Sequence, residues 1–206
     1  FNDIAEISSH NKNVEIEAFI HGAMCISYSG RCLLSNYLNG RDANRGECVQ
    51  ACRWNYSLRE KSKDGDWFDV EEDERGTYIL NSKDLNLIDY IGEMADSGVY
   101  SFKIEGRMKK PEYVALVTSM YRKYVDLYLE KGKSDFKVDP KDKEKLLDLY
   151  NRGGSHGGYY HTQNGREMIS INRPNHAGVP ALKVIKNSGK NVTVKALVDI
   201  HSGDVI

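Results

Sequence analysis

All four cysteines of the chain lie in one stretch, at Cys25, Cys32, Cys48 and Cys52. Their spacing is C-x6-C-x15-C-x3-C, and such clustering is unusual for thiols that serve only as small core residues. Four thiolates can complete the coordination sphere of a metal ion or hold an iron–sulfur cluster. Two disulfides are the alternative, but they are typical of small secreted domains that lack a core. The stretch therefore predicts a metal or cluster site.

The spacing favours an iron–sulfur cluster over zinc. Structural zinc sites pair their ligands in two short knuckles, and only Cys48 and Cys52 are close enough to form one. The gap between Cys25 and Cys32 is too wide for a second knuckle, so zinc is kept as the alternative. Several flanking cations also suit a cluster with net negative charge. These are Arg31, Arg41, Arg45 and Arg53.

Composition limits the class of protein. With 206 residues, 40% of them hydrophobic, the chain can bury a core and hold one or two domains. A net charge of −1 excludes a generally basic nucleic-acid-binding protein but permits a local basic face. No apolar run is long enough to span a membrane, and no secretory leader is visible. Clustered, reduced cysteines predict a cytoplasmic protein.

Hydrophobic patterning predicts an α/β fold in which strands and helices alternate. Proline at the first helical position marks the starts of two of the helices. The predicted strands are Val14–Ile20, Thr77–Leu80, Val99–Ile104, Ala181–Ile185 and Val192–Val198, and the predicted helices are Leu33–Leu38, Ser82 or Asp84 to Asp96, Pro111–Lys131 and Pro140–Tyr150. The last two strands indicate a small antiparallel unit at the end of the chain.

Candidate catalytic residues follow two of these strands. His21 ends the first strand, and Lys103, Glu105 and Arg107 end the strand that begins at Val99. Parallel strands bring their carboxyl ends to one edge of a sheet, where ligands bind. The alternative for His21 is a histidine that bonds only to a nearby backbone group. The following lysines, Lys109 and Lys110, fit a solvated face.

Candidate substrate-binding residues lie beside the cysteines. Arg41 and Arg45 could grip a phosphate or carboxylate, or they could instead pair with Asp42 and Glu47. Two aromatic side chains could stack on a nucleic-acid base or simply pack around the cluster. They are Tyr28 and Trp54.

Five segments together resemble one family. They are HGAMCISYSGRCLLS, NRGECVQACRW, FKIEGRMKKPEYVA, YNRGGSHGGY and NHAGVP, and they are similar to the collagenase-like peptidase family (peptidase family U, number thirty-two). The resemblance implies the C-terminal part of a (β/α) TIM-like barrel, over residues 1–165, whose first strands lie upstream of Phe1. The start of a small antiparallel β domain would follow over residues 166–206.

The resemblance also implies two kinds of activity. The older label is a peptidase that acts on collagen-like substrates. Other relatives hydroxylate a tRNA wobble uridine, with prephenate implicated, a ribosomal RNA cytidine or a quinone-precursor ring, all without molecular oxygen. Those relatives use four cysteines for an iron–sulfur cluster of the 4Fe-4S type, and the four cysteines here stand at the matching positions. One departure is Gly154, where relatives commonly carry Phe.

The residues favour the hydroxylase. The metalloprotease motif H-E-x-x-H does not occur in the chain, and four cysteine ligands would leave zinc no open position for hydrolysis. We therefore expect an iron–sulfur enzyme that hydroxylates tRNA or another RNA, with a prephenate-like small molecule and a paralogous subunit as further partners. A collagenase-like peptidase and a structural metal-binding module are the alternatives.

Overall fold

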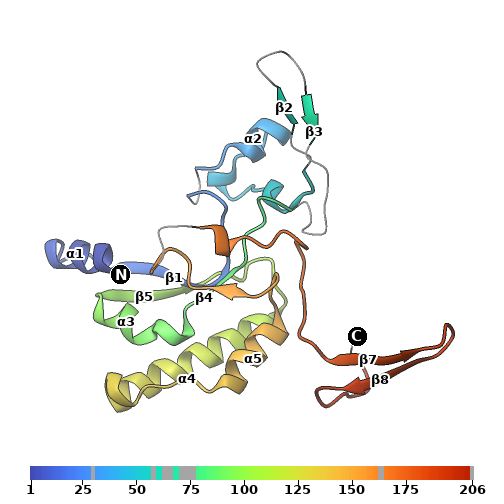
Figure 1. Cartoon of the computed structure of the whole chain (residues 1–206). Coiled ribbons are helices and arrows are strands. Elements are labelled where there is room, and N and C mark those ends of the chain that lie inside the picture. Colours follow the sequence, from blue (N-terminus) through green and yellow to red (C-terminus); the bar gives the residue numbers. More distant parts are fainter. Residues whose placement is uncertain (29–30, 57–58, 62–66, 70–77, 162–164, 205–206) are drawn as a thin grey trace.

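A mixed four-stranded sheet forms the centre of the computed structural model, which describes residues 1–28, 31–56, 59–61, 67–69, 78–161 and 165–204 (Figure 1). Its strands are β1 (Ile16–Ala23), β4 (Asp84–Asn86), β5 (Val99–Ile104) and β6 (Ser155–His156), in the order β5-β1-β4-β6. Strand β1 is parallel to β5, and β4 is parallel to β6, but β1 and β4 are antiparallel. The expected α/β class is confirmed in this coarser form.

Helices cover one side of the sheet (Figure 1). They are α3 (Ile91–Asp96), α4 (Pro111–Asp135) and α5 (Pro140–Leu149). In α4, Val117, Tyr121 and Tyr124 are buried and lie three or four positions apart, so they share the face toward the sheet. The Tyr124 hydroxyl donates to Asp142 of α5 at 2.8 Å, which ties the two helices together.

The strand at Val99–Ile104 and the helix starts at Pro111 and Pro140 are confirmed. The C-terminal strands are also present, as an antiparallel hairpin of β7 (Leu182–Asn187) and β8 (Val192–Ala196) that extends away from the sheet (Figure 1). The division of the chain at residue 166 stays a prediction. Barrel closure is not shown by the described residues.

The prediction between residues 77 and 90 is wrong. Thr77 lies outside the described residues, residues 79–80 form a turn, and the expected helix start is occupied by β4 and a 3-10 helix, η3 (Ile88–Tyr90). The cause lies far along the chain. The Tyr78 N–H donates to the Ile171 carbonyl at 3.0 Å, and the Lys83 N–H donates to the Met168 carbonyl at 2.7 Å. Such tertiary pairing outweighs local helix propensity.

The segment that follows β1, residues 24–69, contains all four cysteines and is called the cysteine segment below. It lies on the side of the sheet away from α4 and α5 (Figure 1). It contains α2 (Leu34–Asn39), the 3-10 helices η1 (Ala43–Arg45) and η2 (Ala51–Arg53), and a hairpin of β2 (Arg59–Lys61) and β3 (Trp67–Asp69). A further helix, α1 (Asn2–His10), precedes β1. Within the described part of the chain, no helix is both long and apolar enough to cross a bilayer.

Candidate functional site

One edge of the sheet and the cysteine segment enclose a cleft of about 1260 Å³. The carboxyl ends of β1 and β5 meet there, and so do the amino ends of β4 and β6, since Ala23 pairs with Asp84 and Asp84 pairs with Ser155. All four cysteines line this cleft. The clustering in the sequence therefore corresponds to a clustering in space.

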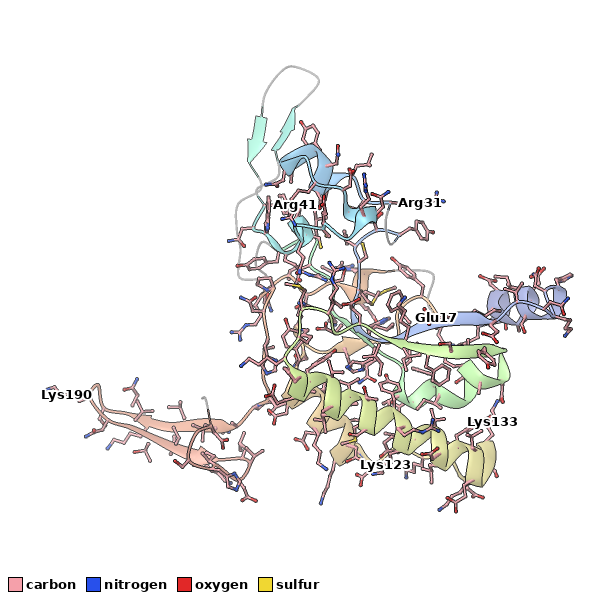
Figure 2. The ribbon with its side chains drawn as sticks, turned by 180° about the vertical axis from the view of Figure 1, so that it is seen from behind. Glu17, Arg31, Arg41, Lys123, Lys133 and Lys190 are labelled. Atoms are coloured by element: carbon pink, nitrogen blue, oxygen red, sulfur yellow. The ribbon has the colours of Figure 1, made fainter. Side chains whose placement is uncertain are left out.

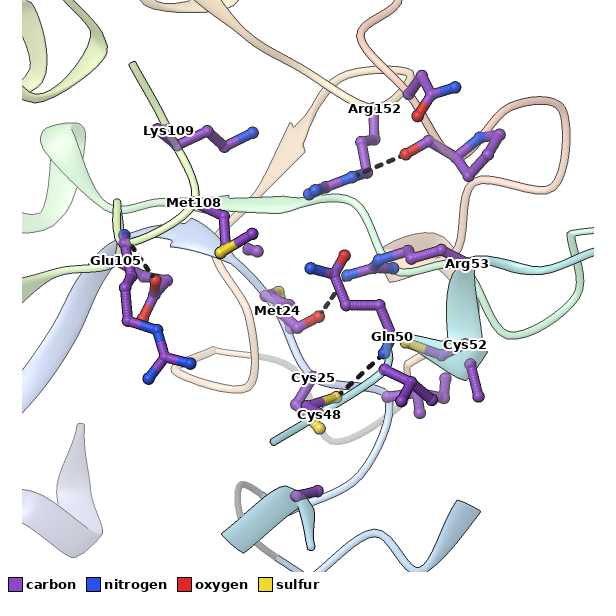
Figure 3. A pocket seen from close by; sticks show the side chains of 18 of the residues that line it. Met24, Cys25, Cys48, Gln50, Cys52, Arg53, Glu105, Met108, Lys109 and Arg152 are labelled. Carbon is purple, nitrogen blue, oxygen red and sulfur yellow. Dashed lines mark hydrogen bonds between the residues drawn. The ribbon is translucent and has the colours of Figure 1, made fainter. Parts of the chain in front are cut away.

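Three loops carry the thiols. Cys25 follows β1, Cys32 precedes α2, and Cys48 and Cys52 flank a turn whose third residue, Gln50, has a left-handed φ of 56°. Because such a φ is strained for a residue with a side chain, the turn is held by its surroundings. In this turn the backbone N–H of Gln50 donates to the Cys48 sulfur at 3.3 Å (Figure 3).

The thiols influence one another electrostatically. All four are free. Burial raises the pKa of Cys52, the neighbouring Arg53 guanidinium opposes that rise, and the other three thiols add to it. Cys25 also accepts a backbone N–H, from Ser27 at 3.4 Å.

These features fit an iron–sulfur cluster. Hydrogen bonds to the ligating sulfurs are a usual means of tuning such clusters, and Cys48 accepts a second one from the Ser35 hydroxyl at 3.8 Å. A single zinc ion would need its thiolates about 2.3 Å from the metal. Among the described residues, no three His, Cys, Asp or Glu side chains converge closely enough to hold one ion. All four thiols line the same cleft, and four thiolates are the usual ligand set of a 4Fe-4S cluster.

Arg53 connects two of the cysteine loops to the sheet. Its guanidinium donates to the Met24 carbonyl at 2.7 Å, just before Cys25 (Figure 3). The same group donates to the Ser82 carbonyl at 3.0 Å. It also donates to the buried Asn81 side chain at 2.8 Å. Since Arg53 follows Cys52 directly, it fixes Cys52 relative to Cys25. Its position in the sequence marks it only as a flanking cation.

Two of the predicted catalytic residues line the cleft, Glu105 and Arg107. The Glu105 carboxylate accepts the Arg107 N–H at 3.0 Å, and the Arg107 guanidinium donates to the Gly46 carbonyl at 2.7 Å. Gly46 has a φ of 86°, and a Cβ there would lie 3.2 Å from the Arg107 guanidinium. Glycine therefore permits this close link between the sheet edge and the cysteine segment.

The other two predicted catalytic residues, His21 and Lys103, do not line the cleft. His21 is buried beneath the site, with Nδ1 3.2 Å from the Tyr121 hydroxyl, and burial lowers its pKa to about 4. It is therefore neutral at physiological pH. Lys103 pairs with Glu17 at 3.1 Å on the partly exposed surface of the sheet. Neither residue touches the space that the cysteines line.

Among the predicted substrate-binding residues, Arg41 and Trp54 line the cleft, whereas Tyr28 and Arg45 do not. Tyr28 is 83% exposed and Trp54 is 41% exposed. Arg41 is exposed and lies within the cysteine segment (Figure 2). Neither arginine forms an ion pair with a described residue, so the expected alternative pairing with Asp42 and Glu47 is not formed.

The structure adds cleft residues that the sequence did not single out. Lys109 is half-buried, which corrects its assignment to a solvated face, while Lys110 is exposed as expected. Arg152 is buried and pairs with Asp84 at 2.5 Å. The only local signal was the glycine-rich loop, in which the Asn151 side chain accepts the N–H groups of the glycines after Arg152 at 3.0 and 2.8 Å.

Comparisons with known proteins agree with the motifs. The tRNA hydroxylation protein P1 of Bacillus subtilis (strain 168) is 50% identical over 116 residues, which are 56% of this chain and 27% of that protein. The tRNA hydroxylation protein P of Escherichia coli (strain K12) is 38% identical over 163 residues, 60% of this chain and 36% of its own length. A Porphyromonas gingivalis (strain ATCC BAA-308 / W83) protein named Collagenase is 40% identical over 147 residues, 71% of this chain and 34% of its own.

The chain thus spans between 27% and 36% of the length of these three relatives. No solved structure is significantly similar to it. The sequence profile described as Peptidase family U32 matches residues 1–170, well over half of the chain. The resemblance indicated by the five motifs is confirmed, and the chain belongs to peptidase family U32.

Proposed function

We propose that the protein takes part in oxygen-independent hydroxylation of tRNA at the wobble uridine, in the cytoplasm. A 4Fe-4S cluster bound by Cys25, Cys32, Cys48 and Cys52 would supply the redox chemistry. The observation that carries the proposal is the single cleft in which all four thiols lie together with Arg41, Trp54 and Arg107. The similarity to proteins named for tRNA hydroxylation supports it.

The chain's own residues would bind and orient the RNA. An exposed indole beside cations is a suitable surface for a base and its phosphates, and Trp54 and Arg41 provide both at the cleft. Arg107, tied to Gly46, would hold a phosphate or the base edge at the opposite wall. His21, Lys103, Tyr28 and Arg45 stay proposed site residues that act from outside the cleft lining. A prephenate-like small molecule and a paralogous subunit are the further proposed partners.

A peptidase is the second candidate, because of the similarity to the Porphyromonas protein named Collagenase. The two candidates differ in their dependence on the thiols. A hydroxylase needs the cysteines as ligands, whereas gelatin cleavage that persists after replacement of all four would support a peptidase. Colourless protein containing one zinc ion would instead indicate a structural metal module.

The first test is anaerobic purification of the full-length protein with analysis of iron and sulfide. We expect a brown protein with about four of each per chain. Nucleoside analysis of tRNA from a strain that lacks the gene should show loss of the hydroxylated wobble uridine, restored by the wild-type gene. Normal hydroxylation in that strain would rule out the proposed activity.

Removal of the cleft's RNA contacts is expected to weaken tRNA binding. Trp54→Ala should lower the affinity by about 1–3 kcal/mol, the usual contribution of one stacked base, and Arg41→Ala should reduce the salt dependence of binding. Both are measured by filter binding at several salt concentrations. Lys133→Ala, on α4 far from Arg41 in Figure 2, is the control and should bind normally. Unchanged affinity of both cleft variants would contradict the RNA interface.

A further inference from the structure

Lys109 places a positive charge in the cleft, and no described carboxylate forms an ion pair with it. Its side chain is half-buried and lines the cleft. Among the described residues it forms no ion pair, and its contacts are with aromatic rings. The ammonium lies over the ring of Tyr150 and 5.4 Å from the centre of the Tyr113 ring. A cation in such a position normally has a partner.

A second cation lies against the same ring. The guanidinium carbon of Arg152 is 5.0 Å from the centre of the Tyr150 ring. Arg152 already donates to Asp84 at 2.5 Å and to the Pro174 carbonyl at 2.9 Å. The Asp84 carboxylate is thus shared among three cations, Arg152, Lys109 and Arg53, and among the described residues only Arg152 forms an ion pair with it. Helix α4 begins two residues after Lys109, so its positive end strengthens the local field.

Flat rings surround these charges. Tyr150 stacks on His176, with ring centres 5.3 Å apart and planes inclined by 14°. Tyr113 is buried and meets Tyr150 edge-on, with centres 6.3 Å apart. Figure 3 shows Lys109 and Arg152 on one side of the cleft, away from Cys25 and Cys48. Excess positive charge between aromatic faces is suited to a planar anion.

We propose that Lys109, Arg152, Tyr113 and Tyr150 form a binding site for a small planar carboxylate, separate from the thiols. The carboxylate would pair with the Lys109 ammonium, and its conjugated body would lie beside the rings of Tyr113 and Tyr150. A phosphate of the RNA backbone fits less well, because Lys109 is half-buried and walled by rings. Assigning this ligand a role in the reaction rests on the proposed function, but its binding does not.

The pH dependence of binding should report Lys109. Burial, together with the charges of Arg152 and Arg53, lowers its pKa to about 8 against the opposing effect of Asp84. The phenol groups of Tyr113 and Tyr150 keep raised pKa values and stay neutral in this range. An anion binds the protonated lysine, so affinity falls as the pH rises through the pKa of the free site. We expect about a tenfold loss between pH 7 and pH 9.

The test measures binding of benzoate to the full-length, anaerobically purified protein by calorimetry. Benzamide keeps the shape without the charge, and cyclohexanecarboxylate keeps the charge without the flat ring. Benzoate should bind at least tenfold more tightly than either probe. Lys109→Met should reduce its affinity at least tenfold and abolish the pH dependence, whereas the matched control Lys110→Met should change it less than twofold.

A second variant keeps the test valid if Lys109→Met is poorly folded. Tyr150→Leu should remove the preference for benzoate over cyclohexanecarboxylate. Equal binding of benzoate to wild type and Lys109→Met, or equal binding of benzamide and benzoate, would overturn the assignment. So would binding of inorganic phosphate or tRNA at Lys109 with no binding of benzoate. A protein that binds benzoate as expected but leaves tRNA unmodified would refute the proposed function alone.

Discussion

Replacing Cys48 with serine is expected to abolish both the iron–sulfur cluster and tRNA hydroxylation. A hydroxyl is a poor substitute for a thiolate ligand, and the Cys48 sulfur accepts hydrogen bonds from Gln50 and Ser35 at 3.3 and 3.8 Å. The amount of modified nucleoside per tRNA should fall by more than about a hundredfold. Loss of the groups that merely support metal ligands already costs about 10–100-fold, and loss of a ligand itself should cost more. Visible absorption and iron content measure the cluster in the same samples.

The control for this variant is Asn44→Ser, an exposed position in the same segment that has no thiol. It should keep the colour, the iron and the activity. If Cys48→Ser hydroxylates tRNA as the wild type does, the cluster cannot be the redox centre of the reaction. If it loses the cluster but cleaves gelatin, the peptidase candidate gains support instead.

Replacing Arg152 with methionine is expected to lower the free energy of unfolding by about 3–5 kcal/mol, the usual result of removing one partner from a buried ion pair. The side chains of Arg152 and Asp84 are 7% and 4% exposed. The second carboxylate oxygen of Asp84 is buried without a hydrogen-bond partner in the described structure, so Arg152 is its main support. Urea unfolding of the full-length protein measures the change.

Two further variants make this test specific. Arg122→Met removes an exposed pair with Asp126 on α4 and should cost less than about 1 kcal/mol. The double variant Asp84→Asn with Arg152→Met removes the uncompensated charge and should recover much of the lost stability. A loss for Arg152→Met no larger than that for Arg122→Met would show that the buried pair contributes little.

The elements that the sequence predicted correctly depend on neighbours along the chain. Pro111 and Pro140 begin helices because a missing N–H is harmless at the first helical position. The alternation from Val99 to Ile104 defines a strand with two different faces. The clustering of the four cysteines in the sequence also predicted that they lie around one cleft, and a bound metal or cluster there stays a prediction.

Tertiary contacts decided the rest. Residues near Asp84 form a strand because they pair with β1 and β6, which are distant in the sequence. The spacing of hydrophobic residues around Asp84 does not predict this pairing. The burial of Lys109 depends on Tyr150 and Arg152, which α4 and α5 separate from it in the chain. Its neighbour Lys110 has the same side chain and is exposed, so residue type could not distinguish them.

The sequence by itself determined the grouping of the four cysteines, the family and most of the helices, because these follow from residue types at short, regular spacing. Only the tertiary structure placed Arg53 between two cysteine loops, His21 in the core and Lys109 in the cleft. Burial and pairing are properties of a side chain's whole surroundings. These surroundings form only in the folded protein, when the sheet edge and the cysteine segment pack together.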